Sequence, residues 1–81
     1  MGDYGDTFNS GIAAELRAQR GRIRMTIDQL VIESGLSKSA VLYYLNDKRQ
    51  IPVPAYLELC RALKISPQAI FDTVEEAIKK S

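Results

Sequence analysis

The side chains of this sequence that could do chemistry are its basic ones, because the residues that usually perform catalysis or bind metals are scarce. The 81-residue chain has no histidine and a single cysteine, Cys60. This shortage argues against a transition-metal site and against most nucleophile–base pairs. We therefore expect neither enzymatic activity nor a cofactor. A lone cysteine also cannot form an internal disulfide, which is typical of a protein of the reducing cell interior.

The basic side chains are concentrated in the middle of the chain, although the net charge is only +1. Residues 1–16 contain three acidic residues and no basic one, whereas residues 17–49 contain seven basic and three acidic residues. Local positive charge of this kind is typical of a surface that binds phosphate groups. A solvated surface without a ligand would have the same charge pattern, so both readings stay open at this point.

The segment from Thr26 to Leu45 is the most informative part of the sequence. Thr26 and Ser37 are suitable N-caps for two short helices, and Gly35 can adopt the left-handed conformation that ends the first. Two helices joined by such a tight turn expose the outer face of the second, about residues 37–45, which could enter a major groove. The alternative is a helical hairpin with no ligand.

Three further helices are expected around this pair. Residues 1–9 lack periodicity and predict a flexible arm, and Asn9 or Ser10 could cap a helix that ends near residues 22–25. Pro52 and Pro54 mark the entry to a fourth helix, and Pro67 begins a fifth. No segment has the alternation of a strand or the length of a membrane span. We therefore predict an all-α, compact five-helix domain over residues 10–81.

The Thr26–Ser37 segment resembles the helix-turn-helix of the lambda-repressor and Cro-like family of phage and bacterial regulators. The resemblance covers about residues 11–71 and extends through Asn46–Arg49 and Leu59–Ser66. It implies a lambda-repressor-like fold and sequence-specific binding to double-stranded DNA at an operator, commonly as a homodimer. It implies no small-molecule substrate and no membrane, and it places the protein in a bacterial host cytoplasm.

The resemblance also suggests which residues contact DNA. Lys38 is the best candidate for a guanine, and Leu42 could meet a thymine methyl group. The full set of candidates for base contacts is Ser37, Lys38, Ser39, Leu42 and Tyr43. The candidates for phosphate contacts are Arg17, Arg20, Thr26, Ile27, Asn46, Lys48 and Arg49.

Some positions depart from the family pattern. Leu45 stands where relatives often have an acid that pairs with the arginine matching Arg20, so we expect Arg20 to be released to solvent or to phosphate. Ile27 occupies a place where glutamine is common. Arg24 and Asp47 replace frequent glycines, and a side chain in a left-handed position there would be slightly strained.

Three side-chain placements have two readings each. We favour Tyr43 as exposed and Tyr44 as part of the core. Cys60 is expected to be buried rather than reactive. In the last helix, Val74, Ala77 and Ile78 could form a dimer contact, or they could pack back onto the first helix.

The sequence as a whole predicts a transcriptional regulator that binds DNA, of the phage or prophage repressor or Cro-like type. One alternative is the antitoxin of a toxin–antitoxin pair, in which the same fold also holds a toxin. The other is a protein-interaction module that has kept the fold and lost DNA binding.

Overall fold

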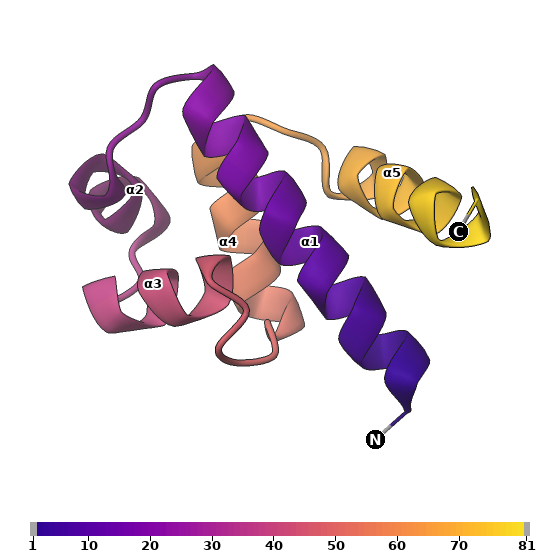
Figure 1. Cartoon of the computed structure of the whole chain (residues 1–81). Helices are drawn as coiled ribbons and strands as arrows, with labels where there is room; N and C mark the ends of the chain where they lie inside the picture. Colours follow the sequence, from indigo (N-terminus) through magenta and orange to yellow (C-terminus); the bar gives the residue numbers. More distant parts are fainter. Residues whose placement is uncertain (1, 81) are drawn as a thin grey trace.

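Five stretches with apolar residues at helical spacing fold into α-helices in the computed structural model, which describes residues 2–80. They are α1 (Asp3–Arg22), α2 (Ile27–Ser34), α3 (Lys38–Leu45), α4 (Val53–Leu63) and α5 (Pro67–Lys80) (Figure 1). Residues 2–80 contain no strand, so the predicted all-α, five-helix fold is confirmed. In this part of the chain, no helix is both long and apolar enough to cross a bilayer.

Helix α1 crosses the middle of the molecule and separates α5 on one side from α2 and α3 on the other (Figure 1). It packs against α3, α4 and α5, while α2 packs against α3 and α4. All five helices contribute side chains to one core, whose fully buried members include Leu16, Leu30, Val41, Leu59, Leu63 and Ile70. The core therefore fixes α2 and α3 relative to the long α1.

The boundaries of α2 and α3 are set by local hydrogen bonds, as the sequence predicted. The Thr26 hydroxyl accepts from the backbone N–H of Gln29 at 3.0 Å, and the Gln29 side chain accepts from the Thr26 N–H at 2.8 Å. Gly35 ends α2 in the left-handed region with φ of 75°, and the Ser37 hydroxyl caps α3 through the Ala40 N–H at 3.1 Å. These contacts satisfy backbone groups that a helix end leaves without partners.

The N-terminal part of α1 differs from the sequence prediction. The helix begins at Asp3, so residues 3–9 are helical rather than a flexible arm, and Asn9 and Ser10 lie inside the helix instead of capping it. Tyr4 and Phe8 extend the apolar stripe of Ile12 by two turns, and the Phe8 ring lies 5.5 Å from that of Phe71 in α5. The prediction of a flexible arm was wrong because Phe8 and Phe71, which are far apart in the sequence, pack together and hold the first turns of α1. Residues 1 and 81, at the ends of the expected arm and domain, lie outside the described residues.

Helix α5 packs back onto α1 through Val74, which is buried. The fit is close at Gly11, where a β-carbon would lie 2.7 Å from Val74 Cγ1. Ala77 is exposed, and Ile78 is half-buried against the core. Val74 therefore packs back onto α1, which is one of the two arrangements that the sequence left open; the other was a dimer contact.

Candidate nucleic-acid interface

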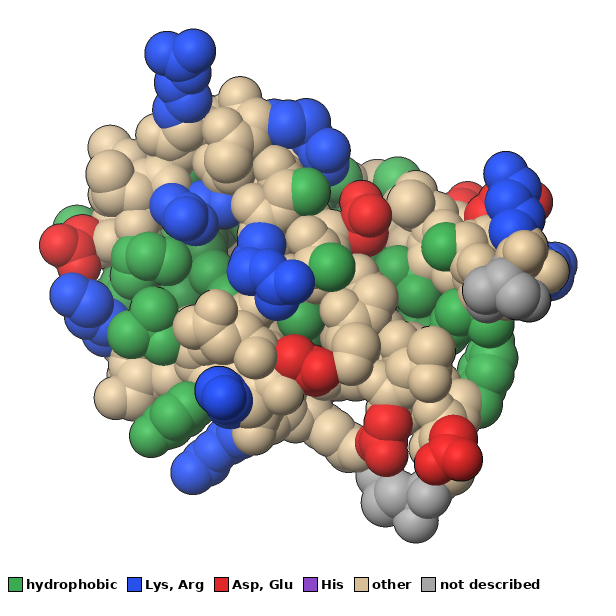
Figure 2. Space-filling view, in the orientation of Figure 1, with side chains coloured by type: hydrophobic (Ala, Val, Ile, Leu, Met, Phe, Trp, Pro, Cys, Tyr) green, Lys and Arg blue, Asp and Glu red, His purple; other side chains and the backbone are tan. Residues whose placement is uncertain are grey.

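The outer face of α3 is exposed, as expected for a surface that meets a ligand. All five residues proposed for base contacts are exposed, with Leu42 at 37% and Tyr43 at 42%. Tyr44, by contrast, is half-buried against the core, so the predicted exposed position of Tyr43 and inward position of Tyr44 are confirmed. Figure 2 shows one side of the molecule, on which most Lys and Arg side chains gather over the half where α2 and α3 lie in Figure 1.

Lys38 lies at the start of this face and forms an ion pair with Asp28 in the first turn of α2. Its Nζ is 3.2 Å from the Asp28 carboxylate, and both side chains are well exposed. An exposed pair of this kind is held weakly because water screens both charges. Lys38 can therefore exchange Asp28 for a guanine or a phosphate.

Two further cations lie just beyond the C-terminal end of α3. The guanidinium of Arg49 lies over the ring of Tyr43, 4.8 Å from its centroid. The backbone N–H of Lys48 donates to the Tyr43 carbonyl at 2.8 Å, which folds the loop back toward the helix. Arg49, expected beside a phosphate, thus also extends the outer face of α3. The face is bounded by Lys38 at one end and by Lys48 and Arg49 at the other.

Two of the three arginines of α1 donate to backbone carbonyls within the fold. Arg17 donates to the carbonyl of Leu45 at the end of α3. Arg20 donates to the carbonyl of Met25 at 2.8 Å and is half-buried. The prediction that Arg20 faces solvent or phosphate is therefore wrong. Leu45 has no carboxylate to accept from Arg20, but the carbonyl of Met25 in the turn after α1 accepts instead. Both arginines stabilise the connections that flank α2 and α3.

The remaining candidates for phosphate contacts fall into different environments. The N–H and hydroxyl of Thr26 are engaged in the capping box, and Ile27 packs partly buried against the core. Asn46 is exposed and ends α3, where its N–H donates to the Leu42 carbonyl at 3.0 Å. Asn46, Lys48 and Thr26 are therefore exposed, but Thr26 is used as the cap of α2. Ile27 packs inward.

The positive φ angles expected from the sequence are present at Arg24 and Asp47, which both have φ of 56°. Lys64 at the end of α4, which was not predicted, has φ of 59°. Side chains rarely adopt this region, so each of these turns is held by its surroundings.

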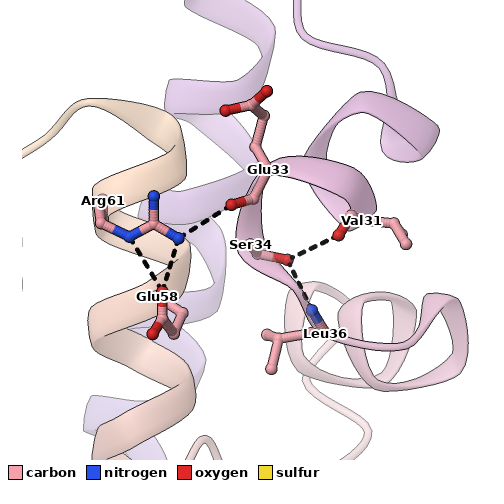
Figure 3. Close-up of polar contacts among 6 residues, drawn as sticks. All are labelled: Val31, Glu33, Ser34, Leu36, Glu58 and Arg61. Atoms are coloured by element: carbon pink, nitrogen blue, oxygen red, sulfur yellow. Dashed lines mark hydrogen bonds and ion pairs between the residues drawn. The ribbon is translucent and has the colours of Figure 1, made fainter.

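A tether from α4 holds the last turn of α2, and the sequence analysis missed it. The guanidinium of Arg61 donates to the Glu33 carbonyl at 3.0 Å and to the Glu58 carboxylate at 2.7 Å (Figure 3). Beside it, the buried Ser34 hydroxyl accepts from the Leu36 N–H at 3.2 Å (Figure 3). The turn between α2 and α3 is thereby held by a hydrogen bond from α4 at Glu33 and by a local one between Ser34 and Leu36. The i, i+3 spacing of Glu58 and Arg61 was a visible signal of the pair, but not of its contact with α2.

The sequence analysis also missed the contacts of Asn9 and Ser10, which bind the loop that follows α3. The signal that could have found them is the four-residue spacing of Tyr4, Phe8 and Ile12, which continues the helical stripe through this segment.

The only cysteine of the chain, Cys60, is not placed to act as a nucleophile. Cys60 is completely buried in α4, as expected, and this burial raises the pKa of its thiol. Burial likewise raises the pKa of Tyr56, whose hydroxyl donates to the Pro67 carbonyl at 2.6 Å. A protonated, enclosed thiol is a poor nucleophile, so both residues serve the packing of α4 against α5.

Comparison with known proteins gives one match. The family described as helix-turn-helix domain matches residues 12–70, from the first half of α1 to the first turn of α5. No curated protein and no solved structure matches the chain.

Proposed function

The chain belongs to the helix-turn-helix domain family, a family of DNA-binding domains, and on that premise we propose that it is a transcriptional regulator that inserts α3 into the major groove of an operator. Within that family we place it in the lambda-repressor and Cro-like type, as a phage or prophage repressor that acts in the bacterial host cytoplasm. The observation that carries the proposal is the exposed outer face of α3, bounded by Lys38 at one end and by Lys48 and Arg49 at the other.

The dimensions and chemistry of α3 suit this role. An α-helix with its side chains is about 10–12 Å in diameter, which fits the major-groove width of about 12 Å. Lys38, Ser39, Leu42 and Tyr43 offer a cation, a hydroxyl, a methyl contact and an aromatic edge to the bases. The Ser37 hydroxyl already accepts from Ala40, which leaves its O–H to donate to a phosphate.

Affinity then depends on phosphate contacts outside α3. Lys48, Arg49 and Asn46 follow the helix directly and are exposed, so they can reach the DNA backbone beside the groove. Phosphate contacts position a protein on DNA without reading its sequence. With few long basic side chains on α3 itself, specificity is expected to depend on two copies bound to a palindromic site.

We include a homodimer in the proposal and place its contact along α5. Support comes from an open groove of about 350 Å³ between α1 and α5, lined in part by Gly11, Ala14, Ala77 and Ile78. Val74 is buried against α1, so we place the contact at the exposed Ala77, next to the half-buried Ile78. Sedimentation at several protein concentrations tests this part, and a monomer at every concentration contradicts it.

The main experiment selects duplexes from a random pool and titrates the best one at several salt concentrations. Lys38→Ala is expected to lower the preference for the selected sequence by about 1–3 kcal/mol, as for one good base contact. Lys48→Ala is expected to weaken binding to all sequences alike and to reduce the salt slope by about 1. Lys79→Ala, which removes the same charge from the end of α5, is the matched control and should change neither property.

Two outcomes contradict the proposed function. The first is the absence of salt-dependent duplex binding at micromolar protein, and the second is equal behaviour of the Lys38→Ala and Lys79→Ala variants. A stable protein partner whose binding is indifferent to Lys38 would instead support the interaction-module alternative.

A further inference from the structure

The first half of α1 binds the loop that follows α3. Asn9 donates through Nδ2 to a carboxylate oxygen of Asp47 at 2.7 Å and to the Arg49 carbonyl at 3.4 Å. Its Oδ1 accepts from the backbone N–H of Ile51 at 2.9 Å. Ser10 donates to the other carboxylate oxygen of Asp47. The Asn9 amide thus binds the loop at three positions: Asp47, Arg49 and Ile51.

A third side chain on the same face of α1 adds to these contacts. Asp6 lies one turn before Asn9 and Ser10, and its carboxylate accepts from the Gln50 side chain at 3.0 Å. Residues 6, 9 and 10 have the i, i+3, i+4 spacing that places side chains on one helical face. Three side chains of this face therefore make hydrogen bonds to residues 47–51.

The conformation of the loop explains why such contacts are needed. Asp47 has φ of 56°, a region that side chains other than glycine rarely adopt. Strained backbone of this kind persists only where the surroundings hold it. Both carboxylate oxygens of Asp47 are held, one by Asn9 and one by Ser10. A glycine would adopt the same φ without strain, but it could not accept either bond.

The loop held in this way contains two of the residues proposed to contact DNA. Lys48 and Arg49 follow Asp47 directly, and both are exposed. The α1 residues that hold the loop lie before residue 12, where the match to the family begins. The matched region therefore does not include the α1 residues that make this contact.

We propose that Asn9 and Ser10 are positioning residues that hold the loop of residues 47–50 so that Lys48 and Arg49 meet the DNA backbone in a single, preformed conformation. This inference rests on the proposed function. Ordering a loop before binding removes part of the entropy cost of association. The contacts of α1 therefore add to affinity without touching the DNA.

The test compares the full chain with its Asn9→Ala/Ser10→Ala double variant. The variant is expected to bind every duplex roughly three- to tenfold more weakly, the effect of losing about one hydrogen bond's net contribution. Its salt slope should fall toward that of Lys48→Ala, and the amide hydrogen of Ile51 should exchange faster. Gln68→Ala removes an exposed side-chain amide that donates only to Asp72 within α5 and lies outside the α1–α5 groove; it is the control that should leave all three properties unchanged.

A double-variant cycle separates positioning from a general loss of stability. If Asn9 and Ser10 act through Lys48, their replacement should matter less when Lys48 is already alanine. Additive effects of the Asn9→Ala/Ser10→Ala and Lys48→Ala changes on duplex affinity would overturn the inference. It would also be overturned if the Asn9→Ala/Ser10→Ala variant kept the native affinity and salt slope while its Ile51 amide exchanged faster. Unchanged exchange at Ile51 would show that the loop is ordered without α1 and would also overturn it.

Failure of the proposed function has a different signature. In that case the native chain itself binds no duplex at any salt concentration. The comparison of Ile51 exchange then still decides whether Asn9 and Ser10 hold the loop.

Discussion

The replacement Gly11→Ala tests the packing that holds α5 against α1. Gly11 lies inside α1, and a β-carbon there would be 2.7 Å from Val74 Cγ1 and 3.3 Å from Val74 Cγ2. Carbon atoms in contact normally lie about 3.5–4.0 Å apart, so the new methyl group overlaps the side chain. Val74 cannot turn away easily, because a valine in a helix has one strongly preferred rotamer.

The expected magnitude is the sum of two opposing effects. Alanine stabilises a helix interior relative to glycine by about 0.5–1 kcal/mol. Overpacking of a well-filled site costs about 1–3 kcal/mol. The net loss in the free energy of unfolding is therefore about 1 kcal/mol, which corresponds to a decrease in Tm of roughly 4–8 °C for a domain of this size.

The measurement is urea unfolding of the variant beside a matched control. Gly21→Ala makes the same change in the same helix, where no atom lies within 4 Å of the new β-carbon, so it should stabilise the protein by about 0.5–1 kcal/mol. In a third variant that also carries Val74→Ala, the new methyl group occupies part of the space that valine leaves. The combined loss should then be smaller than the sum of the single losses. If Gly11→Ala stabilised the protein as much as Gly21→Ala, the close contact between α1 and α5 would be refuted.

Three further predictions follow from the local contacts. Thr26→Ala removes the capping box of α2 and should lower the free energy of unfolding by about 1 kcal/mol, measured in urea; an unchanged midpoint would contradict it. Asp28→Asn removes the partner of Lys38 and a negative charge beside the interface, so the duplex affinity measured by titration should rise. A lower affinity would contradict this and would show that the ion pair positions Lys38. Burial raises the pKa of Cys60, so the folded state keeps a proton that the unfolded state releases; stability should be intact below the ordinary thiol pKa of about 8.5 and should fall as the pH rises above it. Cys60→Ala should flatten this fall in urea unfolding measured across that range, and an equally steep fall in the variant would refute the assignment.

Much of the helix-turn-helix could be predicted because its signals are local. The caps at Thr26 and Ser37 and the left-handed Gly35 each depend on residues no more than three or four positions away. The apolar spacing that buries Leu30 and Val41 is equally visible in the sequence. The exposure of Tyr43 follows from the same periodicity, because its neighbour Tyr44 takes the inward position.

The candidate site was harder to predict, because a basic residue in the sequence does not reveal its partner. Arg17 and Arg20 look like phosphate ligands by type, yet both donate to backbone carbonyls within the fold. Lys38 and Arg49 are exposed as expected, but their contacts with Asp28 and Tyr43 depend on how neighbouring elements fold together. Charge composition alone could not distinguish these two groups.

The sequence by itself therefore determined the helices around the turn and the face that α3 presents, since short-range hydrogen bonds and helical periodicity suffice for both. Only the tertiary structure decided where α1 begins, because Phe8 is held by Phe71 and Asn9 by Asp47, residues distant along the chain. It also decided which cations donate to the protein's own backbone carbonyls. Such contacts form only when the core brings the elements together, and no local pattern encodes which of the distant partners will meet.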